Sequence, residues 1–126
     1  MTDPRTAGRS LVVKLTSGVE APERVSQAFT VAATALASGV PTALWLTGEA
    51  SWLAVPGRAE QFELPYAAPL AELRDAALAG GSLTVCSQCA ARRGLTEADL
   101  VAGAAIRGAA AFVEEVTQAG AQALVY

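Results

Sequence analysis

Short apolar runs alternate along the chain with segments of helical periodicity. The runs have the length and apolar content of buried strands and cover residues 11–15, 42–46, 82–85, 102–106 and 122–125. Between them, apolar residues recur at helical spacing in residues 22–39, 70–78 and about 108–119. Strands that alternate with helices predict an α/β domain with a parallel sheet, because a helical crossover joins parallel strands.

Glycine and proline mark the ends of these elements. Pro22 suits the first turn of a helix, and Gly39, with a proline just beyond it, suits the stop. Residues 1–9 are polar and contain Pro and Gly, so we expect a disordered lead-in before a domain at 10–126. Residues 50–66 mix hydrophobic residues with prolines, and we interpret them as an ordered loop that covers the site or meets another subunit.

The amino-acid composition bears on subunit assembly and on cellular location. Hydrophobic residues make up 52% of the 126 and charged residues only 17%, so part of the apolar surplus is expected in a subunit interface. No apolar run reaches the roughly 18 residues of a membrane-spanning helix, and the first residues lead into no signal-like region. We therefore expect a cytoplasmic protein with no membrane partner.

The charged residues exclude further classes of function. Twelve acidic and nine basic residues give a net charge of −3, and Arg92-Arg93 is the only basic doublet, so no nucleic acid is expected as a partner. Histidine is absent, which removes the commonest general base and the commonest metal ligand. The chemistry must then depend on thiols, carboxylates, arginines or backbone dipoles.

The candidate catalytic residues are two cysteines, Cys86 and Cys89. Cys86 follows a predicted strand, and open α/β sheets bind their ligands at the carboxyl ends of the strands. A helical turn directly after Cys86 would favour its thiolate through unpaired backbone N–H groups, and Arg92 and Arg93 would add positive potential or bind an anion. The alternative is that both cysteines are small buried hydrophobes.

Other uses of the two thiols fit the sequence less well. A structural zinc site needs four ligands and the chain offers two cysteines and no histidine, so neither a metal nor another cofactor is expected. Structural disulfides are rare in the cytosol, whereas adjacent thiols suit sulfur transfer or redox cycling. Glu49 follows the second predicted strand and could act at the same edge of the sheet as an acid or base, or serve only as a helix-start carboxylate.

Residues 85–94, with the sequence VCSQCAARRG, resemble the cysteine segment of the DsrE/DsrF-like family, especially its YchN-like branch. In that family a strand leads into a cysteine, and an arginine followed by glycine comes some eight residues later. Cys86 and Arg93-Gly94 keep this register, and Cys89 stands where YchN-like members carry a second cysteine. Weaker similarity extends from Leu11 to Tyr126.

The resemblance implies a single three-layer α/β domain, in which helices flank a mainly parallel sheet of about five strands. It also implies assembly into homotrimers or homohexamers, with the site near subunit contacts. The residue matched by Cys86 would carry persulfide sulfur from a donor protein to an acceptor protein. Relay members of the family act in complexes of several different subunits and do not generally depend on a second cysteine, so the resemblance does not assign a role to Cys89.

Three functions are therefore considered. The leading hypothesis is a persulfide-carrying sulfurtransferase in an intracellular sulfur relay, in which Cys86 accepts and passes on sulfane sulfur and Cys89 assists its release. The second is a dithiol redox protein in which the two cysteines cycle between thiol and disulfide. The third is a non-catalytic oligomeric module that binds partners through its apolar surface and the loop at 50–66.

Overall fold

Five strands form one parallel sheet in the computed structural model, which describes residues 8–126. The strand order is β4-β3-β2-β1-β5, and every neighbouring pair is parallel. The strands are β1 (Ser10–Leu15), β2 (Thr42–Leu46), β3 (Ser82–Cys86), β4 (Ala105–Arg107) and β5 (Ala121–Val125). The predicted α/β fold is confirmed. The lead-in expected at residues 1–9 lies outside the described residues except for Gly8 and Arg9, which belong to no helix or strand.

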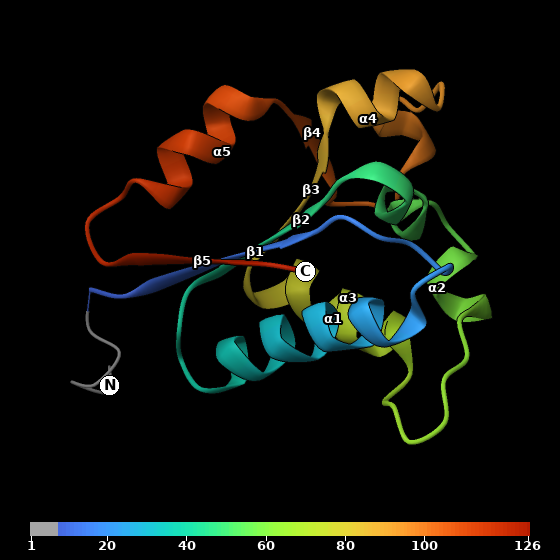
Figure 1. The fold of residues 1–126 in the computed structure, drawn as a ribbon, viewed down its shortest axis with the longest axis horizontal. Helices are drawn as coiled ribbons and strands as arrows, with labels where there is room; N and C mark the ends of the chain where they lie inside the picture. Colours follow the sequence, from blue (N-terminus) through green and yellow to red (C-terminus); the bar gives the residue numbers. More distant parts are fainter. Residues whose placement is uncertain (1–7) are drawn as a thin grey trace.

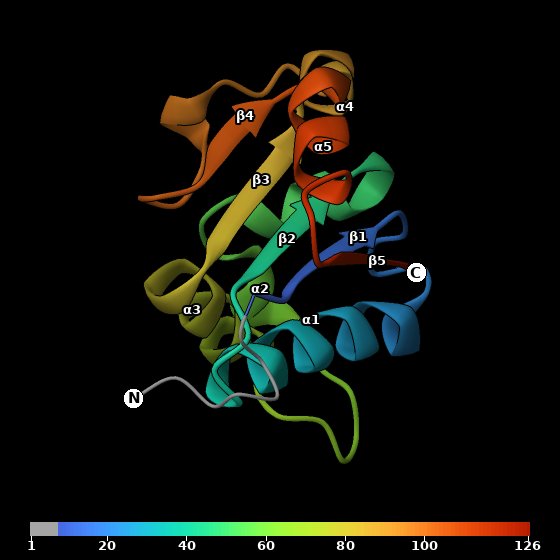
Figure 2. The same cartoon turned by 90° about the vertical axis from the view of Figure 1, so that its left-hand side faces the viewer.

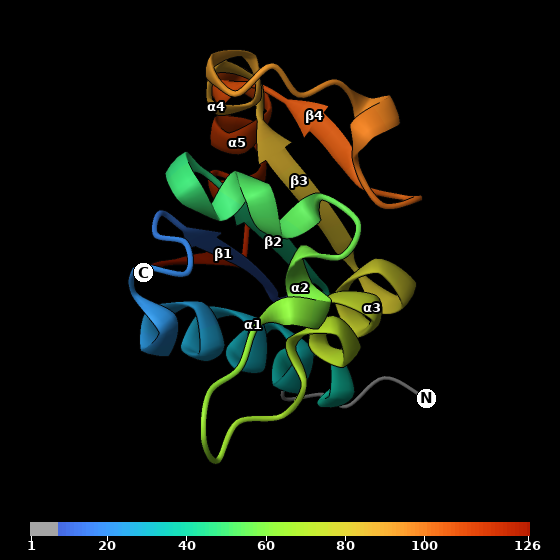
Figure 3. The ribbon, with the colours of Figure 1, turned by 90° about the vertical axis from the view of Figure 1, so that its right-hand side faces the viewer.

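Helices cover both faces of the sheet (Figure 1). Helices α1 (Pro22–Ala37) and α3 (Leu70–Gly80) lie on one face, and α5 (Ala109–Val116) lies on the other. At the carboxyl edge, α4 (Ser87–Arg92) follows β3 and the 3-10 helix η1 (Gly48–Ala54) follows β2. The remaining helices are α2 (Arg58–Gln61) and the 3-10 helix η2 (Glu97–Asp99). Figure 3 shows η1 and α2 together on one side of the molecule.

The two faces of the sheet differ in chemistry because successive strand residues point to opposite sides. The face toward α1 and α3 is apolar and almost wholly buried, and it presents Val13, Leu15, Leu44, Leu46, Leu83 and Val85. Helix α5 lies over the other face (Figure 2). This face holds Lys14, Trp45 and Thr84, which lie side by side in register. One face therefore carries the hydrophobic core, and the other carries charged, aromatic and hydroxyl groups.

Three elements differ from their predicted form. The strand expected at 102–106 is β4 at 105–107, because Gly103 adopts a φ of +93° in a turn that delays the strand. The segment 50–66, expected as a loop, contains most of η1 and all of α2, because Leu53 and its neighbours are buried against the core and helical hydrogen bonds satisfy their backbone. The helix expected at about 108–119 is the shorter α5.

An ion pair ties α2 to α3. The side chain of Arg74 is only 7% exposed, and its Nη1 and Nη2 donate to the two carboxylate oxygens of Glu60 at 2.9 Å each. Its Nε donates to Asp75 at 3.1 Å. The hydrogen bonds from Arg74 lower the pKa of Glu60 from 4.5 to about 2. Arg74 shares the buried side of α3 with Leu70 and Ala77. Within residues 8–126, the acids that compensate its charge are Glu60 and Asp75.

We expect Glu60→Gln to destabilise the protein at neutral pH, lowering the melting temperature by a few degrees, because Arg74 loses its main counter-charge. Since the pKa of Glu60 is lowered by folding, the pair stabilises the fold above pH 4.5 and this contribution is lost as the pH falls toward about 2. The variant should therefore lose stability less steeply over that range. Thermal unfolding followed by circular dichroism measures both effects, with Glu72→Gln on the exposed side of α3 as control. An identical pH profile in wild type and variant would contradict this role.

Candidate functional site

Cys86 lies where β3 ends and α4 begins. It is the last residue of the strand and the N-cap of the helix, with extended backbone angles of φ −60° and ψ 130°. Strand alternation from Thr84 places its side chain on the face of the sheet covered by α5, beside Arg107 of β4 in register. The thiol is free and partly exposed, so it combines a fixed backbone with access from solvent.

Cys89 lies in the first turn of α4 and is almost buried, with 9% of its surface exposed. The backbone N–H of Gly48 donates to its Sγ at 3.1 Å. Gly48 has a φ of +55°, and a Cβ at this position would lie 2.8 Å from the carbonyl oxygen of Thr16. Glycine is therefore the residue that lets this N–H approach the thiol without strain.

The surroundings of Cys86 favour its thiolate. Burial is the largest single influence and raises the pKa of Cys86, but it is outweighed by hydrogen bonds from the backbone N–H and the thiol of Cys89, from the N–H of Gln88, and by the charge of Lys14. The net effect is a pKa below that of an ordinary cysteine. The residue predicted to be the nucleophile therefore lies in a setting that suits one.

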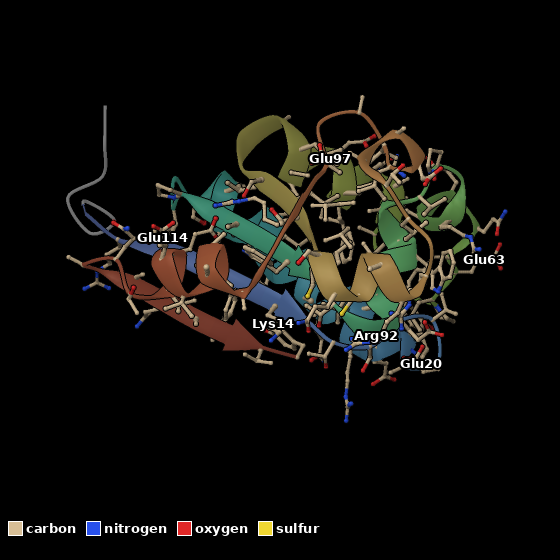
Figure 4. All side chains as sticks on the ribbon, turned by 90° about the horizontal axis from the view of Figure 1, so that it is seen from above. Lys14, Glu20, Glu63, Arg92, Glu97 and Glu114 are labelled. Atoms are coloured by element: carbon tan, nitrogen blue, oxygen red, sulfur yellow. The ribbon has the colours of Figure 1, made fainter. Side chains whose placement is uncertain are left out.

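Lys14 is the site residue that sequence reasoning missed. It lies inside β1, and Figure 4 shows it close to the sulfur atoms under α4. Its Nζ lies 5.0 Å from the centre of the Phe112 ring, and it forms no ion pair with any residue between 8 and 126. A lysine within the apolar run LVVKL was the available signal, because an ammonium group in a strand interior needs an anion or an aromatic ring nearby.

The neighbouring residues Arg92 and Arg93 lie in different environments. Arg93 Nε donates to Oε2 of Glu49 at 2.9 Å, and its Nη1 donates to the carbonyl of Cys89 at 3.1 Å, so this side chain connects α4 with η1. Arg92 is exposed on α4 (Figure 4). The charge of Lys14 contributes to lowering the pKa of Cys86.

Glu49 reaches the carboxyl edge of the sheet, as the sequence suggested. Its Oε2 accepts hydrogen bonds from Arg93 and from Nε1 of Trp52, the latter at 3.1 Å. It also lies in the first turn of η1, where a carboxylate interacts favourably with the helix start. These contacts match the helix-start role better than that of a free acid or base.

A cluster of aromatic and charged side chains fills the space between α5 and the sheet. Glu115 accepts hydrogen bonds from Nε1 of Trp45 at 2.6 Å and from Nη1 of Arg107 at 2.8 Å. The Trp45 and Phe112 rings meet edge to face with their centres 5.3 Å apart. Because Arg107 is the register partner of Cys86, the cluster fixes the surface on which the thiol lies.

Residues 8–126 contain neither a cluster of metal ligands nor a membrane-spanning helix. Within that range, no three Cys, Asp or Glu side chains are grouped so as to hold a metal ion. The two cysteines lie together without a third such ligand beside them. None of the helices in the described part of the chain has the length and apolar composition that crossing a membrane requires.

We expect Cys86 to react with iodoacetamide at a lower pH than an ordinary cysteine, because its pKa is lowered. Lys14→Met should move the midpoint of the pH–rate profile upward, whereas Lys14→Arg should keep it. The midpoints are obtained from alkylation rates measured over a pH series in a Cys89→Ser background. Arg92→Met removes one positive charge from the neighbouring helix and is the matched control. A larger shift in Arg92→Met than in Lys14→Met would contradict this assignment.

Comparisons with solved structures agree with the observed architecture. The ychN protein from E. coli superposes with a TM-score of 0.78 at 15% identity, covering 94% of this chain and 99% of that one. A protein of unknown function from Methanobacterium thermoautotrophicum, MTH1491, superposes with a TM-score of 0.70 at 16% identity and the same coverage. At such identities the likeness establishes the fold alone.

The sequence comparisons establish the family. No curated protein sequence matches the chain significantly. The model of the DsrE/DsrF-like family matches residues 9–125, which is nearly the whole chain and includes all five strands and both cysteines. The chain therefore belongs to the DsrE/DsrF-like family.

Proposed function

We propose that the protein is a persulfide carrier, with Cys86 accepting sulfane sulfur from a donor and passing it to an acceptor. The observation that carries this proposal is a free, partly exposed thiol at the carboxyl end of a strand, at the N-cap of α4 and three residues before a second free thiol. The direction of the Cys86 pKa, below that of an ordinary cysteine, supports it. The association of the DsrE/DsrF-like family with sulfur relay supports the same reading. In this proposal Cys86 is the nucleophile, Cys89 is the neighbouring thiol that assists it, and Lys14 is the cation that favours the thiolate.

The transfer consists of two displacements at sulfur. The Cys86 thiolate attacks the outer sulfur of a donor persulfide, R–S–SH, the donor S–S bond breaks, and the donor leaves as the thiolate R–S⁻. The transferred sulfur keeps its hydrogen, so Cys86 becomes Cys86–S–SH. An acceptor thiolate then attacks the outer sulfur of the Cys86 persulfide, and Cys86 leaves as a thiolate. A lowered pKa assists both steps, because it increases the nucleophilic fraction of Cys86 and makes it a better leaving group.

The contact between the two thiols favours a second candidate, a dithiol redox function. The Cys89 thiolate can attack the inner sulfur of the Cys86 persulfide, forming the Cys86–Cys89 disulfide and releasing hydrosulfide. In this step the Cys89 sulfur is oxidised and the outer sulfur of the persulfide is reduced, while the Cys86 sulfur exchanges one S–S bond for another. In a pure redox cycle, by contrast, the same disulfide forms by exchange with an external disulfide and no sulfur is loaded.

Mass spectrometry after incubation with a small-molecule persulfide distinguishes these functions. We expect one added sulfur on Cys86 in the wild type, none in Cys86→Ala, and continued loading in Cys89→Ala with slower release as hydrosulfide. The Cys89→Ala variant is the matched control because it keeps the nucleophile and removes only its neighbour. Failure to load Cys86 would refute the carrier function, and a disulfide formed without any loaded intermediate would support the redox function.

The active form is proposed to be a homo-oligomer, a trimer or a hexamer. The support lies in apolar surface on α5 and β5, where Val113, Leu124 and Val125 are 53%, 39% and 65% exposed. Strand β5 is also at the end of the five-stranded sheet, and among the described residues it pairs with β1 alone. An exposed apolar edge strand is an unfavourable surface for a monomer in water and a suitable one for contact between copies.

Light scattering coupled to size-exclusion chromatography tests the assembly. We expect the wild type to elute with the mass of several subunits and a Val113→Glu, Val125→Glu variant to shift toward the monomer. Val19→Glu is the matched control, because Val19 is also 65% exposed but lies in the loop before α1. A wild type that is monomeric at micromolar concentration would contradict the proposal.

A further inference from the structure

A pocket of about 540 Å³ is lined by residues of η1, of α2 and of the segment at the start of α1. Its volume falls within the roughly 300–1,000 Å³ of pockets that bind small molecules. Leu53, which is buried, and Phe62 and Pro22, which are partly buried, give it an apolar lining. The pocket can therefore hold a compact organic molecule, and its polar residues decide which one.

The charge around the pocket is predominantly negative. Glu20, Glu49 and Glu63 line it against a single guanidinium, that of Arg58. Figure 4 shows Glu20 and Glu63 at the same end of the molecule. Glu49 uses Oε2 for Arg93 and Trp52, while its Oε1 and the carboxylate of Glu63 make no hydrogen bond with the described residues. Acceptor oxygens are thus available to a cation, and an anionic ligand would be repelled.

An aromatic ring in the pocket already holds a cation. The guanidinium of Arg58 lies 4.9 Å from the centre of the Trp52 ring. Arg58 is exposed and forms no ion pair with the three carboxylates of the pocket, so within residues 8–126 the indole face is its principal partner. An exposed contact of this kind contributes only about 0.5–1 kcal/mol, which an incoming cation can replace.

We infer that this pocket binds a small organic amine. Its ammonium group would displace the Arg58 guanidinium from the Trp52 ring and donate to Glu49 and Glu63, and its apolar body would lie on Leu53 and Phe62. The site adjoins the two cysteines through η1, since Gly48, the residue before Glu49, donates to Sγ of Cys89. Binding here does not require sulfur transfer, so it stands or falls separately from the proposed carrier function.

Titration with phenethylamine, followed in the ¹⁵N–¹H spectrum of the full chain, tests the inference. We expect the indole N–H signal of Trp52 to shift saturably, and that of Trp45, which lies under α5 and donates to Glu115, to stay unmoved as an internal control. Phenethyl alcohol, the neutral counterpart, should shift the Trp52 signal much less. Equal shifts with amine and alcohol, or no saturation with the amine, would overturn the inference.

Two variants separate an amine site from a general hydrophobic pocket. Glu63→Gln should weaken binding of phenethylamine about two- to fivefold because one acceptor charge is lost. Arg58→Gln should tighten it about two- to fivefold because the competing cation leaves the Trp52 ring. Arg9→Gln, an identical charge change just before β1, should have little effect. Weaker binding in Arg58→Gln would show that the arginine itself recognises the ligand and would overturn the inference.

Discussion

The site depends on one constraint, which is that all strands of a parallel sheet end at the same edge. β1, β2 and β3 end at Leu15, Leu46 and Cys86, and the segments that follow them meet there. Gly48 and Cys89 are 41 residues apart in sequence, yet the N–H of one contacts the sulfur of the other. No local feature of the chain could produce this contact, because it arises only when crossover helices return each strand in parallel.

A second property of the sheet, the unequal chemistry of its faces, decides what surrounds the thiol. The core packs on the face toward α1 and α3, where most strand residues are apolar. Helix α5 has no buried residue of its own and is held to the other face by Glu115 and Phe112. Because this second layer is secured by polar and aromatic contacts rather than by a core, it can accommodate Lys14 next to Cys86 without burying an unpaired charge in hydrocarbon.

Elements that follow from local sequence pattern could be predicted from the sequence. Contacts between residues that are far apart in the sequence could not. Strands such as Thr42–Leu46 and the position of Cys86 at a strand end follow from apolar periodicity and from Gly and Pro at the boundaries. Helix η1 escaped prediction because its 3-10 form has no long amphipathic repeat. The pairing of Arg93 with Glu49 and the proximity of Lys14 to Cys86 join distant segments, and spacing along one chain contains no information on either.

The contacts of the two sulfurs make the cysteines unequal. Sγ of Cys89 is almost buried and accepts a hydrogen bond from the N–H of Gly48, so Cys89 is tied to η1. Cys86 is partly exposed at the N-cap of α4, where burial raises its pKa but the backbone N–H groups of Cys89 and Gln88 and the charge of Lys14 help to lower it. In the proposed carrier, sulfur would therefore load first on Cys86, and Cys89 would react only after that loading.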